Sequence, residues 1–204
     1  MGLVAISKVA HRDKALSPHR NFFFAKELLV TQICDFELQH MAGCIPLFFM
    51  HTHKIWEFGG LLGLETGKSL MVKPDSSWRG RIVPAMLHRH PFSIGNLDGG
   101  GQAIVFDEEG EFIVDRDQGH NFFEEDGSTG KVIEHFNLLL SRITHSLVRV
   151  RKACSMINDL DLFKPFDQTI KRSNGRIIQL EGVLSIDAEK FAKLKENQFF
   201  QLQH

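Results

Sequence analysis

Two His-x-His pairs are the part of this sequence best suited to metal chemistry. Their histidines are His51, His53, His88 and His90. Because alternate side chains of a β-strand point to the same face, a pair that lay on a strand could present both imidazoles to one metal ion. Zinc or non-haem iron would suit such ligands, with Glu57 or Glu37 as the carboxylate partner in a metal-dependent enzyme. The chain has eleven histidines, so the alternative is that all four are surface or hydrogen-bonded side chains.

The sequence lacks the signatures of the common catalytic sites. The glycine run 99–101 has neither the lysine and hydroxyl residue of a phosphate-binding loop nor the spacing of a dinucleotide fingerprint. A GxSxG nucleophile elbow is absent, and the acidic clusters 107–109 and 124–126 lack the alternating carboxylates of an EF-hand. These absences leave no catalytic residue and no cofactor to name, and they favour a protein that is not an enzyme.

The cysteines indicate no redox centre. Cys34, Cys44 and Cys154 have no CxxC spacing. We expect reduced thiols that behave as small apolar side chains. The alternative is a disulfide between Cys34 and Cys44, which a chain without an export signal disfavours.

Composition and charge limit the partners of the protein. The 204 residues are 43% hydrophobic and 24% charged, as in an ordinary globular protein that packs one core. A net charge of −1 provides no overall field that would attract nucleic acid or an anionic membrane. No apolar run approaches the roughly 18 residues of a membrane span, and the N-terminus carries no export signal. We therefore expect a cytoplasmic protein without membrane insertion, whose partner is another protein, a second copy of itself or a small molecule.

Short apolar runs separated by glycine predict a series of antiparallel strands. The runs 46–50, 61–64 and 69–72 are typical of a meander, with a turn at Thr66-Gly67. The runs 103–106 and 111–114 flank an acidic turn and predict a β-hairpin. Between these regions, proline at both ends of residues 84–91 favours a short helix or an irregular turn. A further strand is expected at 176–180.

One long amphipathic helix is expected after residue 129, with Ser128 or Thr129 as its N-cap. Its apolar stripe comprises Val132, Phe136, Leu139, Leu140, Ile143, Leu147 and Val150. The basic cluster of Arg149, Arg151 and Lys152 is interpreted as its C-terminal end, where the helix dipole favours positive charge. Asp187 should cap a short helix that contains Phe191. The predicted fold is α+β: a largely antiparallel sheet packed against the long helix, plus short helices.

A set of short motifs spread over most of the chain carries a family resemblance. The most specific is 82–92, which reads IVPAMLHRHPF. The others, in chain order, are Phe24-Ala25, Phe36-Glu37, Met41-Ala42, 45–49, Leu62-Gly63-Leu64, Gly67, Ser69-Leu70, Trp78, 119–127, 180–183 and Asp187. In this order they resemble the SapC-like family, bacterial proteins named for an association with paracrystalline surface layers.

The resemblance implies an accessory role in a bacterial surface-layer or uptake system, and the family brings no established catalytic residues. Family members continue for another segment after the position of Phe199-Phe200, where this chain soon ends. The resemblance therefore implies a single domain over residues 1–204 that lacks the family's last C-terminal segment.

The same resemblance points to Arg89 as a position with a specific role. Its guanidinium suits the carboxylate or phosphate of a ligand, and the alternative is that it pairs with Glu37 or with buried carbonyls and fixes its own loop. Trp78 and Trp56 are suited to form an aromatic wall for a sugar or another flat ligand, or else to pack in the core. We therefore predict a ligand-binding site formed by Arg89, Trp78, Glu37 and Trp56.

Overall fold

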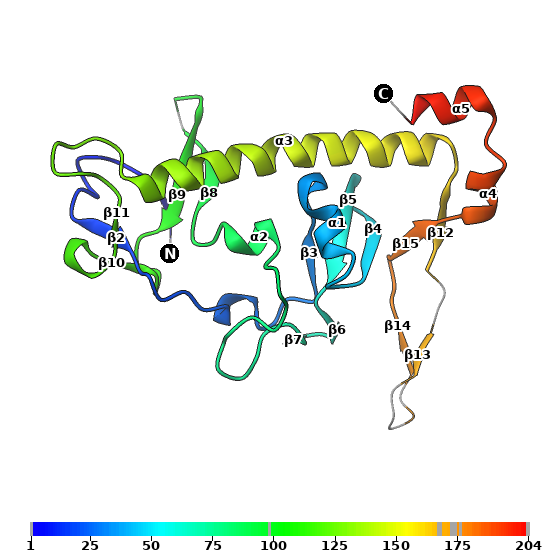
Figure 1. The fold of residues 1–204 in the computed structure, drawn as a ribbon, viewed down its shortest axis with the longest axis horizontal. Helices are drawn as coiled ribbons and strands as arrows, with labels where there is room; N and C mark the ends of the chain where they lie inside the picture. The colour runs from blue at the N-terminus through cyan, green and yellow to red at the C-terminus, as the bar shows by residue number, and fades with distance from the viewer. Residues whose placement is uncertain (1, 98, 167–168, 172–174, 176, 203–204) are drawn as a thin grey trace. The chain divides into compact units, whose positions relative to one another are not determined.

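The computed structural model describes residues 2–97, 99–166, 169–171, 175 and 177–202, and its chain forms two compact units (Figure 1). Unit 1 comprises Met1–Phe22 and Ala85–Thr144, and unit 2 comprises Phe23–Pro84 and His145–His204. The boundary falls inside the longest helix, α3 (Lys131–Asp159), so each unit contains about half of that helix. Every strand pair of the described residues is antiparallel, and with the helices this confirms the predicted α+β class.

Unit 1 contains two small sheets. The first has the order β1-β9-β8, with bounds Leu3–Ala5, Gln102–Asp107 and Ser93–Asn96. The second has the order β10-β2-β11, with bounds Ile113–Asp115, Lys14–Leu16 and His120–Asn121. The glycine run lies in the turn between β8 and β9, where Gly100 and Gly101 have positive φ angles that favour glycine. The unit also contains the short helix α2 (Ala85–His88), as expected from its prolines, and the 3-10 turn η3 (Arg116–Gln118).

The predicted hairpin of residues 103–106 and 111–114 is wrong. Residues 103–106 lie in β9, but only 113–114 of the second segment lie in a strand, β10. β9 pairs with β8 and β1, whereas β10 pairs with β2 in the other sheet. The intervening turn is closed by hydrogen bonds from Gly110 N to Asp107 O and from Ile113 N to Gly110 O. These bonds redirect the chain away from β9, so the acidic segment connects two sheets.

Four phenylalanines form the core of unit 1. Phe92, Phe106, Phe122 and Phe136 are each 2% exposed or less. Their ring centroids lie between 4.6 Å (Phe92 to Phe136) and 6.0 Å (Phe92 to Phe106), in tilted or edge-on arrangements. These are the geometries that aromatic rings prefer, so the cluster is a filled core.

Unit 2 is built on a five-stranded sheet of order β12-β15-β4-β5-β3. Their bounds are Phe163–Pro165, Leu184–Ile186, Leu47–Thr52, Ile55–Leu61 and Val30–Gln32. The predicted strand 46–50 is confirmed as β4, but sequence reasoning missed β5, its hairpin partner. The turn between them consists of His53 and Lys54, both with positive φ angles, in the arrangement of a two-residue hairpin that usually carries Asn or Gly.

Two smaller ladders and several short helices complete unit 2. The predicted meander is interrupted at Leu62, because β6 (Gly63–Glu65) and β7 (Lys68–Ser69) form a separate two-stranded sheet around the expected turn at Thr66-Gly67. The strand predicted at 176–180 is observed as β14 (Ile177–Gln179), paired with β13 (Thr169–Lys171), while Arg176 itself lies outside the described residues. The short helices are η1 (Phe23–Ala25), η2 (Asp35–Glu37), α1 (Leu38–Met41), α4 (Ala188–Ala192) and α5 (Glu196–Gln201).

Helix α3 has the predicted amphipathic character with a shifted start and a later end. Gly130 takes the position expected for Ser128 or Thr129, because its carbonyl accepts the Glu134 N–H, and a Cβ there would lie 2.2 Å from the Asn121 carbonyl oxygen. The buried stripe is Ile133, Phe136, Leu140, Ile143, Ser146, Val150 and Cys154. The helix continues to Asp159 with no basic residue in its last turn, so the interpretation of Arg149, Arg151 and Lys152 as a helix terminus is wrong.

Candidate ligand-binding pocket

A cavity of about 500 Å³ lies in unit 2 beside the C-terminal half of α3. Its lining consists of Phe49, Arg149, Lys152, Ala153, Met156, Ile157, Leu162, Ile186, Phe191 and Leu202. Eight of these ten side chains are apolar, and the other two are cationic. A concave, mainly apolar site with a few polar groups, in this range of volume, is typical of small-molecule binding.

One face of α3 supplies half of this lining. Arg149, Lys152, Ala153, Met156 and Ile157 recur at intervals of three and four residues, so they lie together on one side of the helix. The face adjoins the stripe that packs in the core, which ends at Val150 and Cys154. Two neighbouring faces of the same helix therefore have different roles, one filling the core and one lining the cavity.

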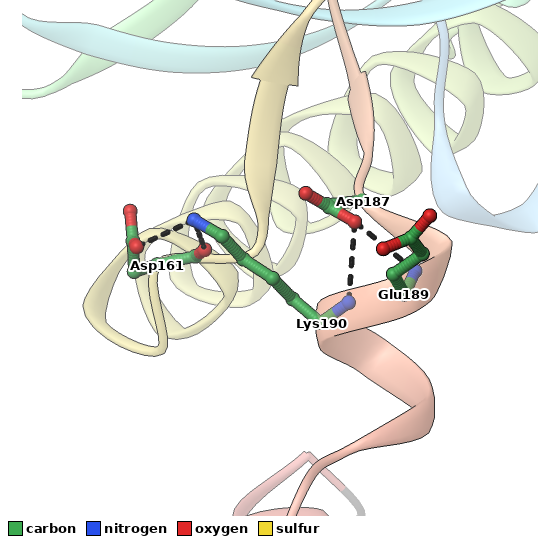
Figure 2. Close-up of polar contacts among 4 residues, drawn as sticks. All are labelled: Asp161, Asp187, Glu189 and Lys190. Atoms are coloured by element: carbon green, nitrogen blue, oxygen red, sulfur yellow. Dashed lines mark hydrogen bonds and ion pairs between the residues drawn. The ribbon is translucent and has the colours of Figure 1, made fainter.

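The opposite wall is fixed by a set of polar contacts shown in Figure 2. The Lys190 ammonium donates to the backbone carbonyl of Asp161 (3.0 Å) and to its carboxylate (2.6 Å). The Asp187 carboxylate accepts the N–H groups of Glu189 and Lys190 at 3.0 and 3.1 Å, which confirms the predicted N-cap of α4. We call Asp161, Asp187 and Lys190 the polar clamp.

Each member of the polar clamp is the direct neighbour of a residue that lines the cavity. Leu162 follows Asp161, Ile186 precedes Asp187, and Phe191 follows Lys190. A backbone hydrogen bond of 2.8 Å from Asp187 N to Leu162 O joins the two strand ends directly. The clamp therefore connects the segments that carry three apolar side chains of the cavity, through contacts that are themselves exposed to solvent.

The two cations of the cavity differ in their environment. Arg149 binds both carboxylate oxygens of Asp35, at 2.5 and 3.0 Å, and this contact lowers the pKa of the Asp35 carboxyl. The Asp35 N–H also donates to the hydroxyl of buried Ser146 at 2.8 Å, which anchors η2 on α3. In the part of the chain that the structure describes, Lys152 has no ion pair. Lys152 thus contributes the uncompensated positive charge of the site.

The four residues predicted to bind a ligand have separate local contacts. Arg89, in unit 1, donates from its Nη1 to the Phe92 carbonyl at 3.2 Å. In unit 2, buried Trp78 donates to the Ile82 carbonyl at 2.8 Å. Buried Glu37 accepts the Cys34 N–H at 2.9 Å.

Trp56, the fourth residue, stacks on His51 and on Phe163 with centroid distances of 4.3 and 4.5 Å. Phe163 in turn lies 5.0 Å from the ring of Phe49, so Trp56 is connected to the cavity through two aromatic contacts. None of the four predicted residues lines this cavity, and a common site formed by them stays a prediction.

The two His-x-His pairs do not lie on strands as the metal hypothesis required. His51 is in β4, but His53 is in the following turn; His88 ends α2, and His90 follows it. Among the described residues, no three His, Cys, Asp or Glu side chains are grouped to hold a metal ion. The strand geometry considered for each pair is therefore not observed, and metal binding by these histidines stays a prediction.

Arg20, which carries no motif in the sequence, organises the second pair. Its guanidinium donates to the backbone carbonyls of His88 (2.7 Å) and His90, and lies 5.6 Å from the Phe136 ring centroid. Burial, and then the charge of Arg20, lower the pKa of His88 and bring that of His90 to about 4. Both shifts favour the neutral form of the imidazole.

The cysteines are free thiols, as expected, and the alternative Cys34–Cys44 disulfide is wrong. Burial raises the pKa of Cys34 to about 12 and that of Cys154 to about 11. Thiols with such values are unreactive at neutral pH.

Comparisons with known proteins identify the family of the chain. A search of curated proteins and a search of solved structures found no match. Among the described residues, no helix combines the length and hydropathy needed to cross a bilayer. The model of the SapC family matches residues 6–204, which is nearly the whole chain. The chain therefore belongs to the SapC family.

Proposed function

We propose that this protein is a non-enzymatic accessory protein that binds a small apolar ligand in the cavity of unit 2. The observation that supports the proposal is the apolar lining of a cavity of about 500 Å³. The cavity is open to solvent, since Ala153 and Phe191 are exposed, and an exposed apolar concavity is typical of a site that binds a ligand.

The biological setting is part of the same proposal. The resemblance that runs from Phe24 to Asp187 supports an accessory role in a bacterial surface-layer or uptake system. In such a role the protein would carry or sense a small molecule without converting it. Turnover of any substrate that is abolished by Arg89→Ala or Glu37→Ala, in protein that remains folded, would contradict the non-enzymatic part.

Binding of the uncharged apolar dye Nile red to the full-length protein tests the cavity directly. Ala153 lines it, so Ala153→Trp places a large ring in the ligand space and should weaken dye binding at least about tenfold, a loss of about 1.4 kcal/mol. Val148→Trp is the matched control, because Val148 is on the same helix, is 60% exposed and does not line the cavity. Equal dye binding by both variants and the wild type would overturn the proposal.

A further inference from the structure

We propose that the ligand of this cavity is a single-chain amphiphile with an anionic head group, whose head binds Lys152 and whose chain lies among the apolar side chains. The inference rests on the proposed function, because it names the chemical class of ligand for the same site.

The lining favours an acyl or alkyl chain over a flat polar ligand. Beyond the two cations, the wall offers only hydrocarbon, thioether and phenyl groups: Phe49, Ala153, Met156, Ile157, Leu162, Ile186, Phe191 and Leu202. None of these side chains can donate a hydrogen bond to a sugar or a base. Methionine and leucine adapt their shape to a flexible chain, and burial of each methylene group contributes about 0.8 kcal/mol.

The charges place the head group at one end of the cavity. Lys152 is exposed and has no ion pair in the described residues, so its ammonium is available to an anion. Arg149, one turn earlier, also lines the cavity and is held in place by its ion pair with Asp35. The charge of Arg149 is matched by Asp35, so the cavity carries a net charge of about one unit and fits one monoanionic head group.

A neighbouring cavity shows where the head group does not lie. It has a volume of about 410 Å³, shares Lys152 and Met156 with the first, and is also lined by Asp159, Leu160 and Gln201. The Asp159 carboxylate repels an anion that moves to this side. The head group is therefore kept at Lys152, and the chain extends toward Leu162, Ile186 and Phe191 behind the polar clamp.

Displacement of Nile red from the full-length protein tests this assignment with three ligands of equal chain length. Palmitate has a carboxylate head group and hexadecyl phosphate has a phosphate head group, whereas hexadecanol is uncharged. We expect one or both anions to displace the dye at concentrations about tenfold lower than hexadecanol, as for a charge-assisted hydrogen bond. The stronger of the two anions identifies the head group as a carboxylate or a phosphate.

Two charge variants determine which side chain is responsible. Lys152→Gln should remove the preference for the anions and leave hexadecanol unaffected. Arg151→Gln is the control, because it makes the same change of charge one residue away, outside the lining of the cavity. Retention of the preference in Lys152→Gln, or its equal loss in both variants, would overturn the role of Lys152.

Different results would overturn the head-group inference and the proposed function. If hexadecanol displaces the dye as well as the anions do, the head-group inference is overturned while an apolar ligand site remains. If the wild-type protein binds neither the dye nor any of the three ligands, the proposed function fails as well.

Discussion

The phenylalanine core of unit 1 and the cavity of unit 2 use similar side chains with opposite results. In unit 1, four rings lie 4.6 to 6.0 Å apart and exclude solvent almost completely. In unit 2, Phe49 and Phe191 line a space of about 500 Å³, and Phe191 is 41% exposed. Apolar residues that fill one another's space stabilise the fold, whereas apolar residues that line an open space are available to a ligand.

The largest effect expected from this contrast is on stability. Phe136→Ala should lower the free energy of unfolding by about 3–5 kcal/mol, since it leaves a void in a close-packed core. The same change at Phe191 should cost less than about 1 kcal/mol, because that ring is partly exposed and faces the cavity. Urea unfolding of both variants measures the difference, and equal costs would remove the distinction between the two regions.

A smaller loss of stability is expected when the polar contact between α3 and η2 is removed. Ser146→Ala leaves the Asp35 N–H without its acceptor and should cost about 1–3 kcal/mol. Ser155→Ala is the control, because Ser155 is exposed on the same helix and should change stability by no more than about 0.5 kcal/mol. If the two serine variants unfold at the same urea concentration, the contact does not stabilise unit 2.

The polar clamp should affect local order more than global stability. Asp187→Ala removes the cap of α4, so the amides of Glu189 and Lys190 should exchange with solvent several-fold faster. Asp187→Asn keeps an acceptor oxygen and should stay close to the wild type. Hydrogen exchange followed by NMR gives both rates, and unchanged exchange in Asp187→Ala would show that the wall does not need this cap.

The smallest effect is the pH dependence of the same cap. The N–H groups of Lys190 and Glu189 hold the pKa of the Asp187 carboxyl below its ordinary value. Because the pKa of this carboxyl is lower in the folded state, ionised Asp187 stabilises the folded state at pH values above the unfolded pKa of about 3.9. This stabilisation is lost as the pH falls through the folded pKa. A protonated Asp187 keeps one acceptor oxygen, as Asn does, so the protection of the Glu189 and Lys190 amides relative to intrinsic exchange should fall in acid toward that of Asp187→Asn. The protection in Asp187→Asn itself should not change between pH 5 and pH 2, and constant wild-type protection over this range would contradict the prediction.

Much of the fold could be predicted from local signals. β4 is observed at 47–52 and Asp187 caps α4, because each depends on periodicity or on capping chemistry within a few residues. Four residues of the predicted helical stripe are buried, Phe136, Leu140, Ile143 and Val150, whereas the other three, Val132, Leu139 and Leu147, are half-buried. The pairing of strands could not be predicted as well. The β4–β5 turn uses His53 and Lys54 in place of the usual Asn or Gly, and β10 pairs with a strand almost 100 residues earlier in the chain.

The cavity could not be predicted because its residues come from segments as far apart in the chain as Phe49 and Leu202. The helical spacing of the sequence does contain one sign of the α3 face that lines the cavity. Ala153, Met156 and Ile157 continue the helical spacing beyond Val150, which would have extended the helix and placed Lys152 within it. The metal hypothesis depended on strands that His53, His88 and His90 do not occupy.

Anomalous diffraction from crystals of the full chain with ω-bromopalmitate would locate the two ends of a bound chain. We expect a bromine peak among Leu162, Ile186 and Phe191, with the carboxylate within hydrogen-bonding distance of Lys152. A bromine peak elsewhere on the molecule, or side chains of the protein itself filling the cavity, would contradict it.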